Sequence, residues 1–357
     1  VGSKEVNDIV ALLPKIMASI TPDSLEAIIH DCAEAVDIVG YNYGHNLYAG
    51  THEKFPERVI LSSETFPARM ASNWNTVLEN DYVIGDFHWT AWDYLGEAGV
   101  GLPVYGTSQA PFSKSYPAFT AACGSVDLIG QPESAAIYTA ILWGTYDKPY
   151  IGVRPVNHSG EKYALGNWRM TDSVASWTWP GCEGRCAEIE VFSPGVEVEL
   201  QQDGQLVARK PLENCKAVFC TPYHPGTLTA IAYGADGAEC GRTVLQTAGT
   251  ATQVVVAPEE SAVRAGDIFY VPMYLADAKG ALSPAKEASV TVEVEGAGRL
   301  LALGSARPDT TESYQAHQFT TYRGRLLAVV LAEKDGQIQI TANTQGVANG
   351  MATIQAI

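Results

Sequence analysis

Apolar positions along the chain change their spacing once, near residue 150. Before that point, continuous apolar runs of strand length alternate with segments of helical spacing, and the runs lie at residues 36–43, 58–64 and 82–89. Beyond it, short strands follow one another between Ser-Pro-Gly, Asp-Gly and His-Pro-Gly turns. The first pattern is typical of strands that alternate with helices in a parallel sheet, and the second is typical of β-sandwiches.

Helical spacing is clearest in four segments. Residues 6–20 are helix-like, and Thr21, followed by a proline and an acid, supplies the N-cap of a second helix. We expect further helices at residues 68–80 and 131–146. Because each of the three apolar runs ends in polar and aromatic residues, the pattern predicts consecutive βα units of a parallel sheet or barrel.

The change of pattern predicts a multidomain chain. We expect the second half of a (β/α)8 TIM barrel at residues 1–147, an immunoglobulin-like β-sandwich at 148–249 and a second immunoglobulin-like β-sandwich at 250–357. A whole barrel needs roughly 250 residues, so we expect its first half to be absent. Neither sandwich has the Cys, Trp, Cys order of an antibody domain.

Composition narrows the classes of function. The 357 residues are 46% hydrophobic, which suits packed domains rather than a disordered chain. Lys and Arg number 23 against 40 Asp and Glu, a formal net charge of −17, so the basic surface of a nucleic-acid binder is lacking. No apolar run approaches the roughly 18 to 20 residues of a membrane-spanning helix, and the first 30 residues do not resemble a signal peptide. We expect neither nucleic acid nor a membrane as a partner.

The 7 cysteines, an odd number spread over a long chain, argue against a disulfide framework. We expect them to be reduced, as in a cytoplasmic protein. Cys182 and Cys186 resemble half of a metal site, but no second close pair follows at zinc spacing, so no metal or other cofactor is expected. Cys215 and Cys220 flank an apolar stretch and are predicted to be buried strand residues.

Candidate catalytic residues follow the three apolar runs. In a βα-barrel the chemistry is carried by the C-terminal ends of the strands, and these ends offer Asn42, Tyr43, Glu64, His88 and Trp89. Glu64 stands directly after an apolar strand and two serines, where its carboxylate would point out of the barrel mouth. Trp89 can offer a flat apolar face to a sugar ring, and Tyr43 can donate to a carboxylate. Aromatic residues beside a carboxylate indicate a carbohydrate substrate.

The same segments carry a resemblance to a known family. Four of them resemble the end of the catalytic barrel of glycoside hydrolase family two, the β-galactosidase and β-glucuronidase group: residues 36–43, 60–67, 85–99 and 123–130. Residues 177–195 and 296–330 look like the β-sandwich modules that follow the barrel in bacterial β-galactosidases. The resemblance covers nearly the whole chain, with its motifs in the family's order.

This resemblance implies a role for each site residue. The family's nucleophile corresponds to Glu64 and its carboxylate-orienting tyrosine to Tyr43. Trp89 corresponds to the tryptophan that floors the sugar pocket. Asn42, His88 and Asp93 are then expected to bind the substrate.

Several of these residues also allow a structural interpretation. Asp93 and Glu97 either serve the substrate or fix the long loop after the last strand. His88 and His45 stand at a barrel rim, where a histidine is more often a hydrogen-bonded support than a catalyst. Asp127 is predicted to cap or order a turn.

The sequence offers no match for the family's second catalytic carboxyl. Retaining glycosidases use two carboxyls about 5 to 5.5 Å apart, and the family's acid/base lies in an Asn-Glu pair. No Asn-Glu pair occurs in this chain; Glu79 and Asn80 have the reverse order. We therefore expect the C-terminal portion of a longer enzyme, inactive alone, whose partner is the N-terminal remainder of that enzyme.

The resemblance favours a retaining exo-glycosidase, with β-galactosidase as the first choice and terminal β-galactosides as substrates. β-Glucuronidases carry an Asn-x-Lys signature near the barrel mouth, which residues 96–130 lack, and the match at residues 214–216 falls in a sandwich. β-Mannosidase and other exo-glycosidase specificities stay open, as does a homo-oligomer.

A third interpretation belongs to a different class of protein. The chain would then be a non-catalytic module that binds carbohydrate or a partner subunit through aromatic residues after the barrel, namely Tyr163, Trp168, Trp177 and Trp179. The alternative for these residues is that they wedge the first sandwich against the barrel.

Overall fold

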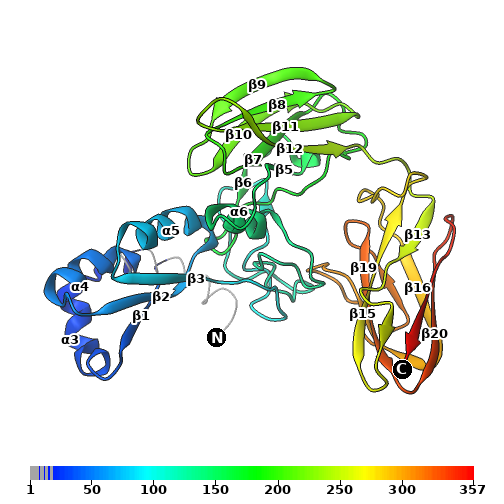
Figure 1. Cartoon of the computed structure of the whole chain (residues 1–357), viewed down its shortest axis with the longest axis horizontal. Helices are drawn as coiled ribbons and strands as arrows, with labels where there is room; N and C mark the ends of the chain where they lie inside the picture. The colour runs from blue at the N-terminus through cyan, green and yellow to red at the C-terminus, as the bar shows by residue number, and fades with distance from the viewer. Residues whose placement is uncertain (1–7, 9–11, 13–14, 17–18) are drawn as a thin grey trace.

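The computed structural model describes residues 8, 12, 15–16 and 19–357. The helix predicted at residues 6–20 lies largely outside this part. Three bodies follow one another along the chain (Figure 1): a helical body with a parallel sheet, a central body of two sheets and a C-terminal body of two sheets. Among the described helices, none is long and apolar enough to cross a membrane.

The helical body is built on a parallel sheet in the order β1-β2-β3. Its strands are β1 (Ile38–Asn42), β2 (Val59–Thr65) and β3 (Val83–His88). The helices that follow or precede them are α3 (Pro22–Ala33), α4 (Tyr48–Lys54) and α5 (Met70–Glu79). Strand residues such as Val39, Ile60 and Val83 form a core with helix residues such as Ala33 and Tyr48. The predicted alternation of strands and helices is confirmed here.

The start of α3 follows the sequence signal at Thr21. The Thr21 hydroxyl accepts the backbone N–H of Ser24 at 3.2 Å, and the Ser24 hydroxyl accepts the N–H of Thr21 at 2.9 Å. This reciprocal arrangement satisfies two donors that a helix start leaves unpaired. The predicted N-cap is therefore confirmed.

Apolar side chains remain exposed on the parallel sheet. Along β1, buried Val39 and Tyr41 alternate with exposed residues, and Ile38 is 45% exposed. On β3, Ile84 is 52% exposed. Parallel sheets in folded proteins are usually covered on both faces, so this sheet is only half covered by the described residues.

The central body contains two antiparallel sheets, in the orders β10-β7-β5 and β12-β11-β8-β9. Its strands are β5 (Tyr150–Val153), β7 (Cys186–Phe192), β8 (Glu197–Gln202), β9 (Gln205–Pro211), β10 (Lys216–Pro222), β11 (Thr227–Tyr233) and β12 (Glu239–Gln246). Ile189 and Phe219 of the first sheet share a buried core with Leu200 and Leu228 of the second. Trp177 belongs to this core, in edge contact with Tyr223.

The C-terminal body repeats this plan with sheets in the orders β13-β15-β19-β17 and β14-β21-β20-β16-β18. Its strands are β13 (Gln253–Val256), β14 (Ala262–Val263), β15 (Ile268–Ala276), β16 (Ser289–Gly296), β17 (Gly298–Gly304), β18 (Gln318–Thr320), β19 (Arg325–Ala332), β20 (Gly336–Asn343) and β21 (Gly350–Ala356). Phe269, Val330 and Ile340 lie in one continuous buried core.

Long connections of little regular structure join the three bodies. They contain helix α6 (Ser134–Leu142), which is shorter than predicted, and a two-stranded sheet of β4 (Val104–Tyr105) and β6 (Tyr163–Ala164). The C-terminal body reaches this region through Pro308, whose carbonyl accepts the N–H of Phe119 at 3.0 Å. The loops therefore lie where the bodies meet (Figure 1).

The cysteine predictions need correction. Cys186 and Cys220 form a disulfide, with sulfurs 2.08 Å apart, so the expectation of fully reduced cysteines was wrong. The antiparallel pairing of β7 and β10 places Cys186 opposite Pro222, and Cys220 is two residues away, which makes the cysteines diagonal neighbours. An odd count along the sequence could not reveal this pairing.

The prediction that Cys215 and Cys220 are buried strand residues was wrong in part. Cys220 lies in a strand as predicted but is exposed, and Cys215 precedes β10 in a turn with a φ of 60°. Cys182 is buried and free. Within the described residues, no three His, Cys, Asp or Glu side chains form a group that could hold a metal ion.

Candidate active site

Glu64 lies at the C-terminal end of β2, beside the end of β1. The pairing of the two strands shifts by one residue after Tyr41, so that Asn42 faces Glu64. The backbone N–H of Tyr43 then donates to the Glu64 carbonyl at 2.7 Å. The strand ends therefore bring Asn42, Tyr43 and Glu64 together, as expected for neighbouring parallel strands.

Tyr43 orients the Glu64 carboxylate. Its hydroxyl donates to Oε1 of Glu64 and accepts a hydrogen bond from the indole N–H of Trp168 at 2.8 Å. Burial and the bond to Glu64 raise the pKa of the Tyr43 phenol far above its ordinary value. The phenol is therefore a permanent donor at neutral pH, and it fixes one carboxylate oxygen.

Tyr43 has an uncommon backbone conformation. Its φ is 54°, in the left-handed region that non-glycine residues rarely occupy. Strained residues of this kind persist where the surroundings hold them in place. Here Phe66 stacks on the ring, with centroids 4.2 Å apart, and Trp168 meets it edge-on.

Trp168 enters the site from the connection between β6 and β7. Its ring is perpendicular to Phe66 and Phe112, with centroids 5.0 and 5.3 Å away. The sequence analysis named Trp168 only as one of several aromatic residues after the barrel and predicted no role for it in the site. The sequence separation of 125 between Trp168 and Tyr43 explains why no local pattern could reveal the contact.

Trp89 follows β3 and remains partly open to solvent. Its backbone N–H donates to the Thr65 carbonyl at 2.9 Å, which ties it to the residue after Glu64. The residue is 36% exposed. The indole N–H donates to the Tyr94 hydroxyl at 3.0 Å, and that hydroxyl donates to the Glu97 carboxylate. The ring is thus anchored at its polar edge while part of its surface is accessible.

Glu97 influences the site through its charge. Burial and the bond to Glu97 raise the pKa of Tyr94 well above its ordinary value. The Glu97 carboxylate also contributes to the raised pKa of Tyr43. Glu97 is therefore bonded to Tyr94, a site residue that the sequence did not single out.

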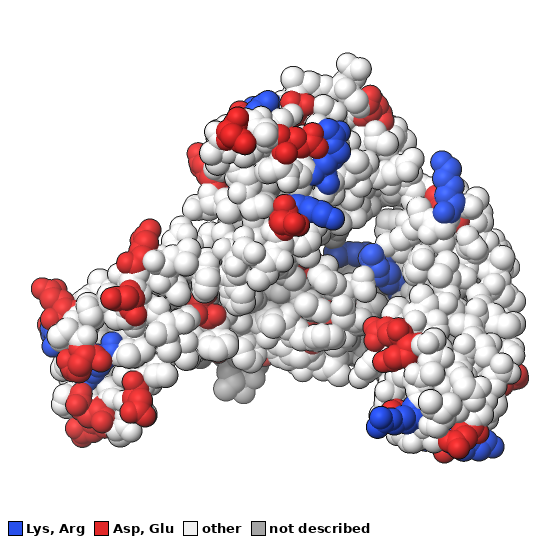
Figure 2. Space-filling model, viewed as in Figure 1, with Lys and Arg blue, Asp and Glu red and all other residues white. Residues whose placement is uncertain are grey.

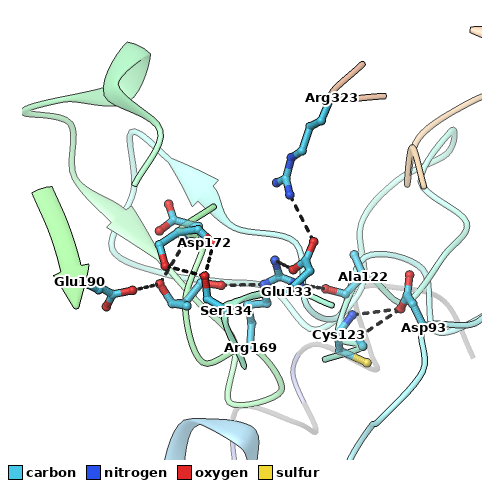
Figure 3. A network of polar contacts seen from close by, with 12 residues as sticks. Asp93, Ala122, Cys123, Glu133, Ser134, Arg169, Asp172, Glu190 and Arg323 are labelled. Carbon is cyan, nitrogen blue, oxygen red and sulfur yellow. Dashed lines mark hydrogen bonds and ion pairs between the residues drawn. The ribbon is translucent and has the colours of Figure 1, made fainter. Parts of the chain in front are cut away.

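Asp93 lies four residues after Trp89 and binds the backbone of a later part of the same long connection. It is 8% exposed, and its Oδ1 accepts the backbone N–H groups of Cys123 at 3.1 Å and Gly124 at 3.4 Å (Figure 3). Burial raises the pKa of Asp93 above its ordinary value, against these hydrogen bonds. Its described contacts fix the loop after the last strand, one of the two interpretations considered for this residue.

The two histidines have side-chain partners of their own. His88 lies within hydrogen-bond distance of the Ser125 hydroxyl, at 2.9 Å, and His45 within 2.9 Å of the Arg69 guanidinium. Burial lowers the pKa of both imidazoles. They are therefore neutral at neutral pH. Asn42 is exposed, 3.5 Å from the Ser63 hydroxyl.

Asp127 orders a turn, as predicted. Its Oδ1 accepts the backbone N–H groups of Ile129 at 3.1 Å and Gln131 at 2.9 Å. Burial, reinforced by the charge of Glu133, raises its pKa to about 6.

Comparison with protein families identifies two regions of the chain. Residues 254–353 match the model of glycoside hydrolase family 2 C-terminal domain 5. Residues 184–241 match a domain of unknown function, DUF4982. The two matches fall in the C-terminal body and the central body respectively.

Similar proteins extend the match over most of the chain. β-Galactosidase BoGH2A of Bacteroides ovatus is 26% identical over 372 aligned positions, which cover 90% of this chain and 39% of that protein. A solved structure of a glycosyl hydrolase family 2 member from Bacteroides cellulosilyticus is 29% identical, with a TM-score of 0.85 over 95% of this chain and 44% of that one. A β-glucuronidase of the same family, 18% identical with a TM-score of 0.61, shares the fold over 82% of this chain and 27% of its own. The chain thus spans less than half the length of these relatives.

Proposed function

Because the chain corresponds to the C-terminal part of glycoside hydrolase family 2 proteins, we propose that it is the C-terminal portion of a retaining exo-glycosidase. Glu64 is the nucleophile, and terminal β-galactosides are the substrates. The observation that carries the proposal is the carboxylate of Glu64 at a strand end, held by Tyr43, which Trp168 holds in turn; the backbone of the partly exposed Trp89 is bonded to Thr65, the next residue.

Glu64 would act in a double displacement. One carboxylate oxygen is held by the Tyr43 hydroxyl, and the carboxylate attacks the anomeric carbon to form a glycosyl-enzyme that water then hydrolyses. A second carboxyl protonates the leaving oxygen and later activates the water. No Asn-Glu pair is present here, so this carboxyl comes from the preceding part of the enzyme, and the chain alone is inactive.

The same proposal assigns the architecture. Strands β1, β2 and β3 are the last three strands of a TIM barrel, and the central and C-terminal bodies are immunoglobulin-like sandwiches, divided near residues 147 and 249. The exposed Ile38 and Ile84 support this assignment, because the remaining barrel strands would cover them.

Galactose is favoured over glucuronic acid on two grounds. The relative with 26% identity over 90% of the chain is a β-galactosidase. The loop at residues 96–130 has no Asn-x-Lys triplet, and its Lys114 ammonium donates to the Pro111 carbonyl of the same loop at 2.7 Å. β-Glucuronidase is the alternative, because proteins of that activity share the fold. The reaction needs no metal or organic cofactor.

Covalent trapping tests the nucleophile directly. The full-length enzyme is inactivated with a 2-fluoro galactoside, and mass spectrometry of its peptides should show the label on Glu64. Glu64→Gln should lower kcat by roughly 10³-fold or more with the melting temperature preserved, because the amide keeps the shape but cannot attack. Glu97→Gln is the matched control and should still be labelled. A label elsewhere would refute the assignment, and preferential hydrolysis of an aryl β-glucuronide would support the alternative.

A further inference from the structure

Glu133, the residue directly before α6, joins two arginines from different parts of the chain (Figure 3). One carboxylate oxygen accepts from the Arg169 guanidinium, and the other accepts from Nη1 of Arg323 at 3.2 Å. Arg323 lies in the C-terminal body, 190 residues from Glu133 in sequence. The Glu133 side chain is 16% exposed, so both contacts are largely shielded from solvent.

Arg169 links this bridge to the candidate active site. Its Nε donates to the Thr171 carbonyl at 2.8 Å and its Nη1 to the Ala122 carbonyl at 3.1 Å. The residue before it is Trp168, whose indole donates to the Tyr43 hydroxyl. The guanidinium is therefore held on three sides, and the backbone it fixes is the one that carries Trp168.

The turn that presents Arg323 is tightly constrained. The φ angles of Arg323 and Gly324 are 50° and 74°, both in the left-handed region. A Cβ on Gly324 would lie 2.6 Å from the Ser283 carbonyl oxygen, so this position requires glycine. The backbone N–H groups of Tyr322 and Arg325 donate to each other's carbonyls at 3.0 Å. Arg323 thus extends from a fixed backbone.

The bridge borders a cleft between the bodies. Glu133, Arg169 and Arg323 are among the residues that line a space of about 820 Å³. Figure 2 shows basic side chains in the hollow between the C-terminal body and the rest of the molecule. At the edge of this cleft the bodies are joined by direct contacts between charged side chains.

The electrostatics keep Glu133 ionised. Burial alone would raise its pKa, but the charges and hydrogen bonds of Arg169 and Arg323 outweigh burial and hold the pKa below its ordinary value. Removal of one arginine would leave a shielded carboxylate with a single partner, which is a costly arrangement that neighbouring groups relieve by moving. Glu133 would then be drawn fully toward Arg169, and this pull would compete with the two carbonyl bonds that hold the Arg169 guanidinium.

We propose that Arg323 is a positioning residue for the candidate active site. Through Glu133 and Arg169 it fixes the loop of Trp168, and thereby the donor that holds Tyr43 against Glu64. The C-terminal body then takes part in setting the geometry of the nucleophile. The effect on turnover rests on the proposed glycosidase function, whereas the effect on Trp168 does not.

The test uses the full-length enzyme labelled with 5-fluorotryptophan, with the ¹⁹F signal of Trp168 assigned by Trp168→Phe. We expect Arg323→Met to shift or broaden this signal and to lower kcat for an aryl β-galactoside by about fivefold, the size of one lost hydrogen bond, with KM within twofold. Arg323→Lys should restore much of both. Arg299→Met is the matched control, because Arg299 forms an exposed ion pair with Glu333 in the same body at 2.8 Å and should change neither.

Glu133→Gln provides a second variant on the other side of the bridge. It should perturb the same signal, and adding Arg323→Met to it should have little further effect, since Arg323 acts through Glu133. An unchanged Trp168 signal in Arg323→Met would overturn the inference even if kcat falls. A shifted signal in an enzyme that cleaves no aryl glycoside supports the positioning of Trp168 and counts against the proposed function instead.

Discussion

The parallel sheet and the C-terminal body differ in how completely they bury the apolar residues of their strands. On β19, Leu326, Ala328 and Val330 are essentially inaccessible, because two sheets face each other and each covers the other. On the parallel sheet, Ile38 and Ile84 remain about half exposed, because helices cover only one face. The two sheets of the sandwich bury each other's apolar residues, whereas the sheet that carries Glu64 leaves one apolar face exposed. We therefore expect core substitutions in the C-terminal body to affect mainly stability, and substitutions at the end of the parallel sheet to affect mainly activity.

The largest expected effect is on the stability of the C-terminal body. Phe269 of β15 is fully buried in its core, so Phe269→Ala should lower the free energy of unfolding by roughly 3 to 5 kcal/mol. Chemical denaturation measures this loss. The folded fraction of the full-length enzyme should retain its kcat/KM, since Phe269 lies outside the bridge to the site. A normal stability together with lost activity would break the comparison.

Trp89→Ala should show the reverse pattern in the full-length enzyme. The ring is anchored through Tyr94 but partly accessible, and its loss removes apolar surface beneath the sugar. We expect kcat/KM to fall by about tenfold or more, with the melting temperature within a few degrees of the parent. If the variant instead loses roughly 3 to 5 kcal/mol of stability and its folded fraction has normal kcat/KM, Trp89 is a core residue.

Two turns of the same geometry offer a test by pH. Asp127 and Asp277 each accept two backbone N–H groups, from the residues two and four positions later. Burial raises the pKa of Asp127 to about 6, whereas the backbone N–H of Gly249, with the turn donors, lowers the pKa of Asp277. The same turn thus carries opposite pKa shifts in the two regions.

The signs of the two effects follow from proton binding. Native Asp127 binds its proton more tightly than the unfolded chain, so its contribution is full below about pH 4 and is lost as the pH rises through about 6. Asp127→Asn should therefore gain roughly 1 to 2 kcal/mol relative to the parent between these values, measured by denaturation at each pH. Asp277→Asn should lose stability relative to the parent as the pH rises toward about 4, the value of the unfolded chain, and the full loss should persist above it. Equal slopes for the two variants would contradict the assigned shifts.

The smallest effect is expected at the exposed side of the parallel sheet. In this chain Ile84→Ser should change the free energy of unfolding by less than about 0.5 kcal/mol, because Ile84 is 52% exposed. In the full-length enzyme the cost should exceed about 1 kcal/mol, since further barrel strands would bury the side chain. Leu78→Ser, on the exposed surface of α5, should be nearly neutral in both. Equal small effects of Ile84→Ser would argue against a covered sheet.

The elements that sequence patterns predicted well are those with a buried side. Strands β1, β2 and β3 coincide with the apolar runs predicted at residues 36–43, 58–64 and 82–89. Strands β9 and β12 carry no such apolar run, because they are the edges of their sheet, where most side chains are exposed and polar. Helix α4 was missed as well; it is only 7 residues long and has no side-chain cap.

The residues of the candidate site likewise fall into those that the sequence could bring together and those that it could not. Tyr43 and Glu64 could be placed together because they follow neighbouring parallel strands, a relation that chain order reveals. Trp168 and the bridge from Glu133 to Arg323 depend on how separate bodies dock, at separations of 125 and 190 residues. No local propensity or periodicity encodes such contacts.

The docking of the C-terminal body also limits how such enzymes can be recombined. The Pro308 carbonyl meets the backbone N–H of Phe119, a contact that any sequence with this fold can reproduce. The contact between Arg323 and Glu133 depends on two particular side chains. A chimaera that receives the C-terminal body of a homologue would keep the first contact and lose the second unless both partners are exchanged together. Residues 133 and 323 are thus a natural pair to match when modules of this kind are shuffled.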